Sequence, residues 1–124
     1  MSKYKEIFKL KKMLEDAEIP FEFIDRFEVM VPEEKRETMR LACPDFEWYQ
    51  ICYPSNSNRW ISVIQGLGTY GAEWDKLEIM GGLTPLERYK MGTESVIGWL
   101  TARNVFKRIK NHYEEEKIKW KKQS

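Results

Sequence analysis

The middle of the sequence contains three strand-like runs joined by loops too short to hold a crossover helix. The runs span residues 46–53, 59–65 and 76–80. The first two are rich in aromatic and β-branched residues, which favour strands, and the third alternates apolar and charged residues from Lys76 to Ile79. The loops that follow Tyr53 and Gln65 are short and rich in serine, asparagine and glycine. Parallel neighbours need a connection of about a dozen or more residues. The strands are therefore expected to pair antiparallel.

Helices are expected at both ends of the chain. The first is predicted to start at a Ser2 cap and run to about Ala17, and the last to start at a Thr101 cap. Apolar side chains recur along both at helical spacing, namely Ile7, Leu10, Leu14 and Ala17 in the first helix and Val105, Ile109, His112/Tyr113 and Trp120 in the last. The tail 117–124 is expected to fray. A brief third helix is predicted at 84–92, from the Thr84, Pro85 and Glu87 start signals to Gly92.

A further strand is expected at 21–27, followed by a polar excursion with a short helix at 31–40 that Pro32 opens. The fold class that results is α+β. It has an antiparallel sheet of about four strands, a meander, with the N- and C-terminal helices packed on one face. The length of 124 residues predicts a single domain, 1–124.

Cysteine and histidine are scarce, which argues against most site chemistry. There are two cysteines, Cys43 and Cys52, and one histidine, His112. A secreted domain of this size usually carries more cysteine, and the N-terminus lacks an export-like apolar stretch, so a cytoplasmic protein is expected. No metal, cofactor or catalytic residue is predicted, and the chain is expected not to be an enzyme. Spatial pairs of carboxylates stay open, because sequence does not reveal them.

The segment Gly66–Gly71 matches the pattern G-x-G-x-x-G of dinucleotide-binding loops. That function needs a long helix directly after the loop, whereas here a strand follows within a few residues. The segment is therefore interpreted as a strand-joining loop with glycines at positive φ.

The chain has five tryptophans, a large number for one small core. Trp48 and Trp60 are expected on neighbouring strands, where their rings would form a cross-strand pair. If one face of the sheet is left uncovered by helices, they would instead form a platform able to stack a base or a nucleotide-like ligand. Trp74, in a polar loop, is the aromatic residue most expected to be exposed.

Charge is segregated although the net charge is only +1. Residues 1–12 carry a net +4 and residues 101–124 a net +5. The two terminal helices together would present a basic face able to meet nucleic-acid phosphates or an acidic protein. Lys107, Arg108 and Lys110, with Trp120, are the candidate residues. A plainly solvated surface is the simpler interpretation.

Several stretches together resemble small uncharacterised proteins carried by phages and prophages of Gram-positive bacteria. They are 6–10, 19–23, 49–54, 62–64, 70–71, 77–81, 98–102, 105–106 and 108–109. Relative to that pattern, residues 28–45 look like an insertion. The resemblance implies an accessory protein in the bacterial cytoplasm, and it carries over no catalytic or ligand residue.

The leading hypothesis is a protein that binds a host or defence protein, for example as an anti-CRISPR inhibitor. One alternative is nucleic-acid binding through the basic terminal helices. A second is the sequestering of a small nucleotide by Trp74, Tyr70 and the glycine loop. Oligomeric state stays open, a homodimer included.

Overall fold

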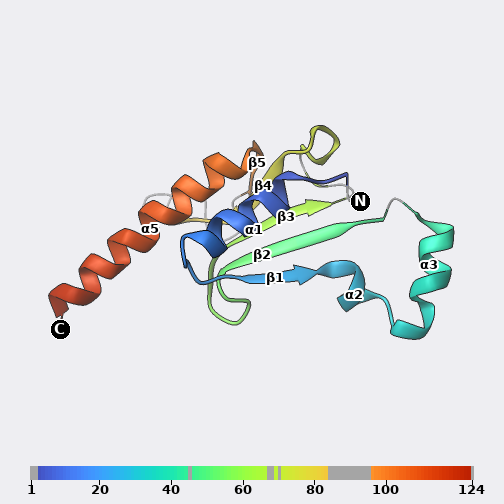
Figure 1. Cartoon of the computed structure of the whole chain (residues 1–124), viewed down its shortest axis with the longest axis horizontal. Helices are drawn as coiled ribbons and strands as arrows, with labels where there is room; N and C mark the ends of the chain where they lie inside the picture. Colours follow the sequence, from blue (N-terminus) through green and yellow to red (C-terminus); the bar gives the residue numbers. More distant parts are fainter. Residues whose placement is uncertain (1–2, 45, 67–68, 70, 84–95, 124) are drawn as a thin grey trace.

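The computed structural model describes residues 3–44, 46–66, 69, 71–83 and 96–123, with only the backbone of 120–123 included. Its centre is one sheet whose strands follow chain order, β1-β2-β3-β4-β5, with every neighbouring pair antiparallel. The strands are β1 (Glu22–Asp25), β2 (Trp48–Pro54), β3 (Arg59–Gly66), β4 (Leu77–Gly81) and β5 (Val96–Leu100). The predicted α+β meander is confirmed, with five strands in place of about four (Figure 1).

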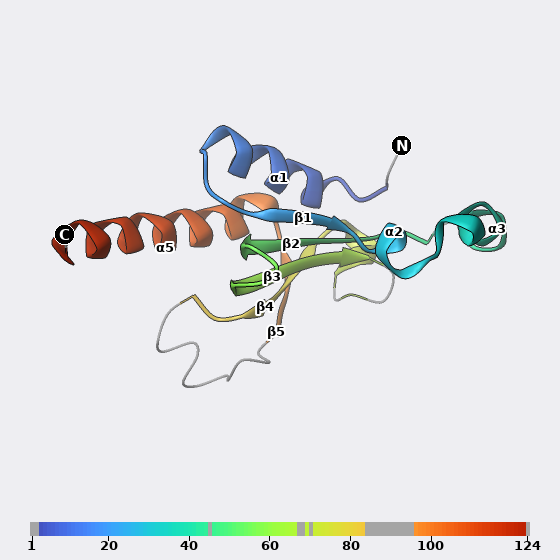
Figure 2. The same cartoon turned by 90° about the horizontal axis from the view of Figure 1, so that it is seen from below.

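Two helices, α1 (Glu6–Asp16) and α5 (Ala102–Gln123), cover the same face of the sheet (Figure 2). The predicted stripes form the core: Ile7, Leu10 and Leu14 of α1 are buried against Ile51 of β2 and Val63 of β3. Ala17, which was expected in the stripe, is exposed because α1 ends at Asp16. The helix face of the sheet therefore takes most of the large apolar side chains.

The cap of α1 comes from a distant residue. Ser2 lies outside the described residues, and Asp75 Oδ1 accepts hydrogen bonds from the backbone N–H groups of Lys5 and Glu6, at 2.8 and 3.2 Å. The Glu6 side chain in turn accepts from the backbone N–H of Ala102 at 3.2 Å. Each of these carboxylates therefore satisfies helix N–H groups that would otherwise lack partners.

The predicted cap of α5 is confirmed, since Thr101 Oγ1 accepts from the backbone N–H of Asn104 at 3.1 Å. Val105 and Ile109 are fully buried, as the periodicity predicts. The helix extends through Gln123 and so includes the described part, 117–123, of the segment 117–124 that was expected to fray. No helix among the described residues is long and apolar enough to cross a membrane.

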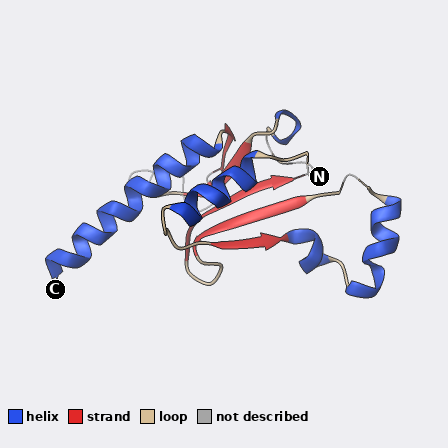
Figure 3. Cartoon of the chain, in the orientation of Figure 1, coloured by secondary structure: helices blue, strands red, loops and turns tan. Residues whose placement is uncertain are grey.

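The excursion between β1 and β2 is helical. The strand predicted at 21–27 ends at Asp25, whose side chain accepts from Phe27 N and Glu28 N and so starts α2 (Arg26–Met30). A 3-10 turn, η1 (Glu33–Lys35), and α3 (Arg36–Ala42) follow, and α3 lies beyond the end of the sheet (Figures 1 and 3). The sequence-based prediction missed α2 and also β5, and the helix predicted at 84–92 lies outside the described residues.

Candidate functional site

The two faces of the sheet differ in what covers them. Helices α1 and α5 cover one face, and no described helix lies over the other (Figure 2). Alternation along β2 sends Tyr49, Ile51 and Tyr53 to the helices and Trp48, Gln50 and Cys52 to the opposite side. The opposite face is the one predicted to hold an aromatic platform.

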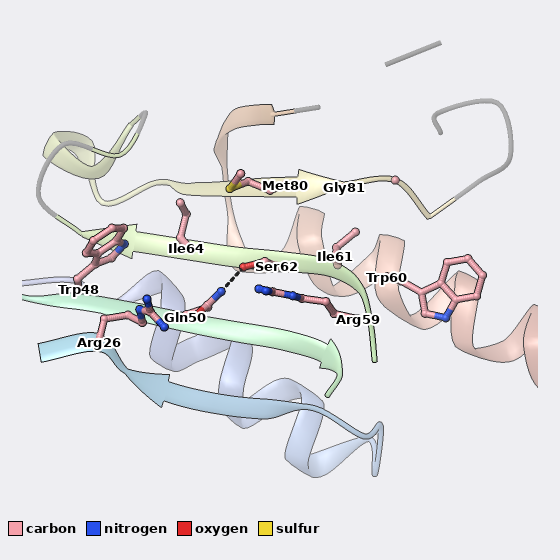
Figure 4. Close-up of a pocket in the computed structure, with 11 residues that line it drawn as sticks. Arg26, Trp48, Gln50, Arg59, Trp60, Ile61, Ser62, Ile64, Met80 and Gly81 are labelled. Carbon is pink, nitrogen blue, oxygen red and sulfur yellow. Dashed lines mark hydrogen bonds between the residues drawn. The ribbon is translucent and has the colours of Figure 1, made fainter. Parts of the chain in front are cut away.

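A pocket of about 530 Å³ lies on this face (Figure 4). Its described lining combines two guanidinium groups, a polar centre and apolar walls, contributed chiefly by Arg26, Trp48, Gln50, Arg59, Ile64 and Met80. Pockets that bind small molecules typically enclose about 300–1,000 Å³. The space therefore suits a ligand of modest size.

The polar centre of the pocket is a pair of buried side chains. Gln50 is opposite Ile64 in the β2–β3 register and reaches diagonally to Ser62, where its Nε2 donates to Ser62 Oγ at 2.6 Å. Gln50 is only 8% exposed, and its Oε1 has no hydrogen-bond partner in the described part of the chain. The pocket therefore keeps an unused acceptor at its centre.

Trp48, at one end of the pocket, keeps an unused donor. Its indole Nε1 is buried and, among the described residues, has no partner. The indole lies against Gly66, its cross-strand neighbour, where a Cβ atom would come within 2.4 Å of Trp48 Cδ1. The absence of a side chain at Gly66 therefore sets the position of this ring.

Arg26 and Arg59 lie on either side of Gln50 (Figure 4). Arg26 begins α2 and Arg59 begins β3. Neither guanidinium forms an ion pair with a carboxylate of the described residues. The side-chain contact shown for Arg59 is a weak one, from Nη1 to Cys52 Sγ at 4.0 Å.

These two cations also act on the buried thiol of Cys52. Burial raises the pKa of Cys52 above its usual value, while Arg59, and more weakly Arg26, oppose the rise and Glu22 adds to it. The thiol therefore stays protonated near neutral pH, and Cys52 is a free, buried cysteine.

The expected cross-strand pairing of Trp48 with Trp60 is wrong. Trp48 is opposite Gly66, and Trp60 lies at the other end of β3, near the β-bulge. The Trp60 ring packs against His112 of α5, with ring centroids 4.7 Å apart. Both tryptophans nevertheless line the pocket, at opposite ends (Figure 4).

His112 is buried, and Tyr53 shares a hydrogen bond of 2.8 Å with its Nδ1. Its Nε2 is 3.8 Å from a carboxylate oxygen of Glu116. Burial, followed by the charge of Glu116, raises the pKa of Tyr53 to about 12. A neutral phenol thus links β2 to α5, an arrangement that supports helix packing. No cluster of three or more potential metal ligands occurs in the part of the chain that is described.

The candidate residues predicted from the sequence do not converge on the pocket. Trp74, in η2 (Ala72–Trp74), is 69% exposed as expected. Lys107 and Lys110 are exposed on α5 and Arg108 is half-buried there. Tyr70 and the Trp120 side chain lie outside the description. None of the four described side chains lines the pocket.

The glycine segment behaves as a connection between strands. Gly66 belongs to β3, and Gly71, at φ 88°, leads into the three-residue turn η2. That part of the segment therefore lacks the long helix that dinucleotide binding requires. Positive φ is confirmed for Gly71 and wrong for Gly66, while Gly68 lies outside the description.

Lysines of the basic α1 surface are partly neutralised within the helix. Lys9, Lys11 and Lys12 lie 3.2, 2.8 and 3.7 Å from carboxylates of Glu6, Glu15 and Asp16, respectively. Exposed pairs of this kind add little stability, but they reduce the positive potential that nucleic-acid phosphates would meet.

Comparisons with protein-family models, with curated proteins and with solved structures find no match. The candidate site therefore rests on its own geometry. Of the two residues expected to form a platform, Trp48 lies on the pocket face, whereas the Trp60 ring packs against His112 of α5. Sequence reasoning missed Arg26, Arg59 and Gln50. The alternation in β2 was the available signal for Gln50, because it places a polar residue in the middle of a strand.

Proposed function

We propose that this protein binds a small molecule in the sheet-face pocket. The observation that carries the proposal is the pair of unused polar atoms, Gln50 Oε1 and Trp48 Nε1. A buried donor or acceptor without a partner costs about 1–3 kcal/mol. A ligand that presents one donor and one acceptor would remove both costs on binding. This function corresponds to the small-nucleotide alternative from the sequence, at a different site.

The first experiment follows the indole N–H of Trp48 by ¹H–¹⁵N NMR. The probes are adenosine, uridine, indole-3-carboxylate and the four common nucleoside monophosphates, each at millimolar concentration. We expect at least one probe to shift the Trp48 resonance, assigned by its loss in Trp48→Phe, and to leave the Trp74 resonance unmoved. If no probe moves the Trp48 resonance, the proposal is wrong.

A stability measurement provides an independent check on the same pocket. Groups kept for binding are often not optimal for stability. Replacing both partners of a buried hydrogen bond by apolar groups of similar shape is often neutral or stabilising. The double variant Gln50→Leu/Ser62→Ala should therefore unfold at the same or a higher urea concentration while losing ligand binding. A large loss of stability would indicate that the pair serves the fold.

Protein binding, the leading expectation from the sequence, is a second candidate function with an observation of its own. The α2–α3 excursion exposes Val29, Met30 and Leu41, at 65%, 51% and 80%. Val29 and Met30 belong to α2 and Leu41 to α3. Large exposed apolar side chains that gather in one region are typical of interaction surfaces. A host or defence protein of a phage-infected bacterium remains the proposed partner.

The test of this second function compares Val29→Ser/Leu41→Ser with the exposed control Lys107→Ser. Neither change should alter unfolding, because the replaced side chains are exposed. Any partner retained by the native protein should be lost with the first variant and kept with the second. Equal retention by both variants would count against this surface.

A further inference from the structure

We infer that the ligand of the sheet-face pocket is an organic anion: a flat ring with a hydrogen-bonding edge that carries a phosphate or carboxylate group. This inference rests on the proposed function and adds the charge and shape of the ligand. Arg26 and Arg59 would hold the anionic group, and Trp48 with Gln50 would hold the edge of the ring.

The charge of the pocket lining points to an anion. Two arginines and no carboxylate occur among the described lining residues. Arg26 is half-buried, and neither Arg26 nor Arg59 forms an ion pair with a described carboxylate. Because these guanidinium groups lack an ion-pair partner among the described carboxylates, an anionic ligand can supply one. The planar set of N–H donors in each guanidinium matches two oxygens of one carboxylate or phosphate.

Carboxylates elsewhere on this face do not line the pocket. Glu22 is opposite Cys52 in the β1–β2 register, and its Oε1 accepts from the backbone N–H of Asn56 at 3.2 Å. Glu78 is opposite Ile64 and is buried. Neither carboxylate therefore lies among the described groups that a ligand in the pocket would meet.

The remaining lining suits a flat ring. Ile64 and Met80 supply apolar surface, and Trp48 adds an indole at one end (Figure 4). A ring edge that offers both an acceptor and a donor would complement Trp48 Nε1 and Gln50 Oε1. Because Arg26 and Arg59 lie on either side of Gln50, the anionic group would sit close to the polar edge of the ring.

Two sources supply this chemistry, nucleoside monophosphates and heteroaromatic carboxylates, and the experiment separates them. Isothermal titration calorimetry would compare AMP, UMP and indole-3-carboxylate with adenosine, uridine, indole and inorganic phosphate. The variants are Arg26→Gln and Arg59→Gln, with Arg103→Gln as the control, since Arg103 is exposed on α5 and outside the pocket. Thermal unfolding of each variant verifies that it folds.

We expect one anionic probe to bind at least tenfold more tightly than its neutral counterpart and than inorganic phosphate. Its affinity should fall about tenfold in Arg26→Gln and in Arg59→Gln, stay unchanged in Arg103→Gln, and decrease as salt is raised. A preference for the nucleotides assigns the phosphate source, and a preference for indole-3-carboxylate assigns the carboxylate source.

The failures are distinguishable. If adenosine or uridine binds as tightly as its monophosphate and the arginine variants have no effect, the charge inference is wrong while the pocket still binds small molecules. If inorganic phosphate binds as tightly as the organic anions, the ring is not recognised and the inference is wrong. If no probe binds and the Trp48 resonance stays unmoved, both the inference and the proposed function fail.

Discussion

Removing the side chain of Asp75 tests how the fold is joined, because one oxygen of this residue connects three segments. Asp75 Oδ1 accepts from Lys5 N at 2.8 Å, from Glu6 N at 3.2 Å and from Gln65 Nε2 at 2.7 Å. Gln65 is fully buried, and its Oε1 accepts from Ile7 N at 3.1 Å. The perturbation we choose is Asp75→Gly, since Asp75 has φ 54° and glycine adopts this conformation without strain.

The expected loss combines two contributions. Losing a helix cap costs about 1 kcal/mol, and leaving the buried Gln65 amide without its acceptor adds about 1–3 kcal/mol. Asp75→Gly should therefore lower the free energy of unfolding by about 2–4 kcal/mol. The matched control is Asp75→Asn, which keeps an oxygen acceptor, tolerates the positive φ and loses only the charge at the helix terminus, at a cost of about 0.3–1 kcal/mol.

Urea unfolding followed by circular dichroism measures both variants, with the slope of the transition used to verify two-state behaviour. A third variant, Gln65→Met, removes the buried donor. In that background Asp75→Gly should cost only about 1 kcal/mol, the value of the cap alone. If Asp75→Gly and Asp75→Asn differ by less than about 0.5 kcal/mol in the native background, the reasoning is refuted.

Three further predictions concern single positions. Gly66→Ala should displace the Trp48 indole, because Trp48 Cδ1 would be 2.4 Å from the new methyl group. The variant should lose about 1–3 kcal/mol of stability and the response of the Trp48 resonance to ligand. An unchanged Trp48 resonance would contradict this prediction. Gly81→Ala should destabilise by about 1–3 kcal/mol, because φ is 103° and the new Cβ would lie 2.6 Å from the Trp60 carbonyl oxygen; unfolding at the native urea midpoint would show that this strain is absent. In the folded protein the pKa of Tyr53 is raised to about 12. Between about pH 10 and 12 the unfolded chain loses this proton while the folded state keeps it, so the free energy of unfolding should fall by roughly 2 kcal/mol. The variant Tyr53→Phe should not show this loss of stability at alkaline pH. Parallel profiles of unfolding free energy against pH for the two proteins would contradict the prediction.

Local patterns in the sequence were sufficient to predict four strands of the sheet and the terminal helices. Alternation in β2 and β3, short loops and the apolar spacing of α1 and α5 each reflect packing within one element. The same patterns missed β5, in which Gly98 and a Trp99 at φ 63° interrupt regular strand geometry. Asp25 ended β1 early because its side chain satisfies the first N–H groups of α2.

The candidate site depends on contacts that local patterns do not encode. Arg26 and Arg59 are 33 positions apart in the sequence. They line one pocket because β1, which leads directly into α2, and β3 both flank β2. The Asp75 cap of α1 likewise joins segments that are 70 positions apart. Nothing in the sequence around either arginine indicates that the other lines the same pocket.

The polar centre of the sheet face opposite α1 and α5 is the strongest reason to look for function there. A face that serves only packing would carry apolar side chains, and one that only meets solvent would leave its polar residues exposed. Gln50 and Ser62 are both polar and both buried, at 8% and 6% exposure, and one of their hydrogen-bonding atoms is left unused. Departures of this kind from consistent folding rules are expected at functional sites. The helix face of the sheet is packed around Ile51 and Val63. Its apolar packing stabilises the fold, so the opposite face can keep buried polar side chains.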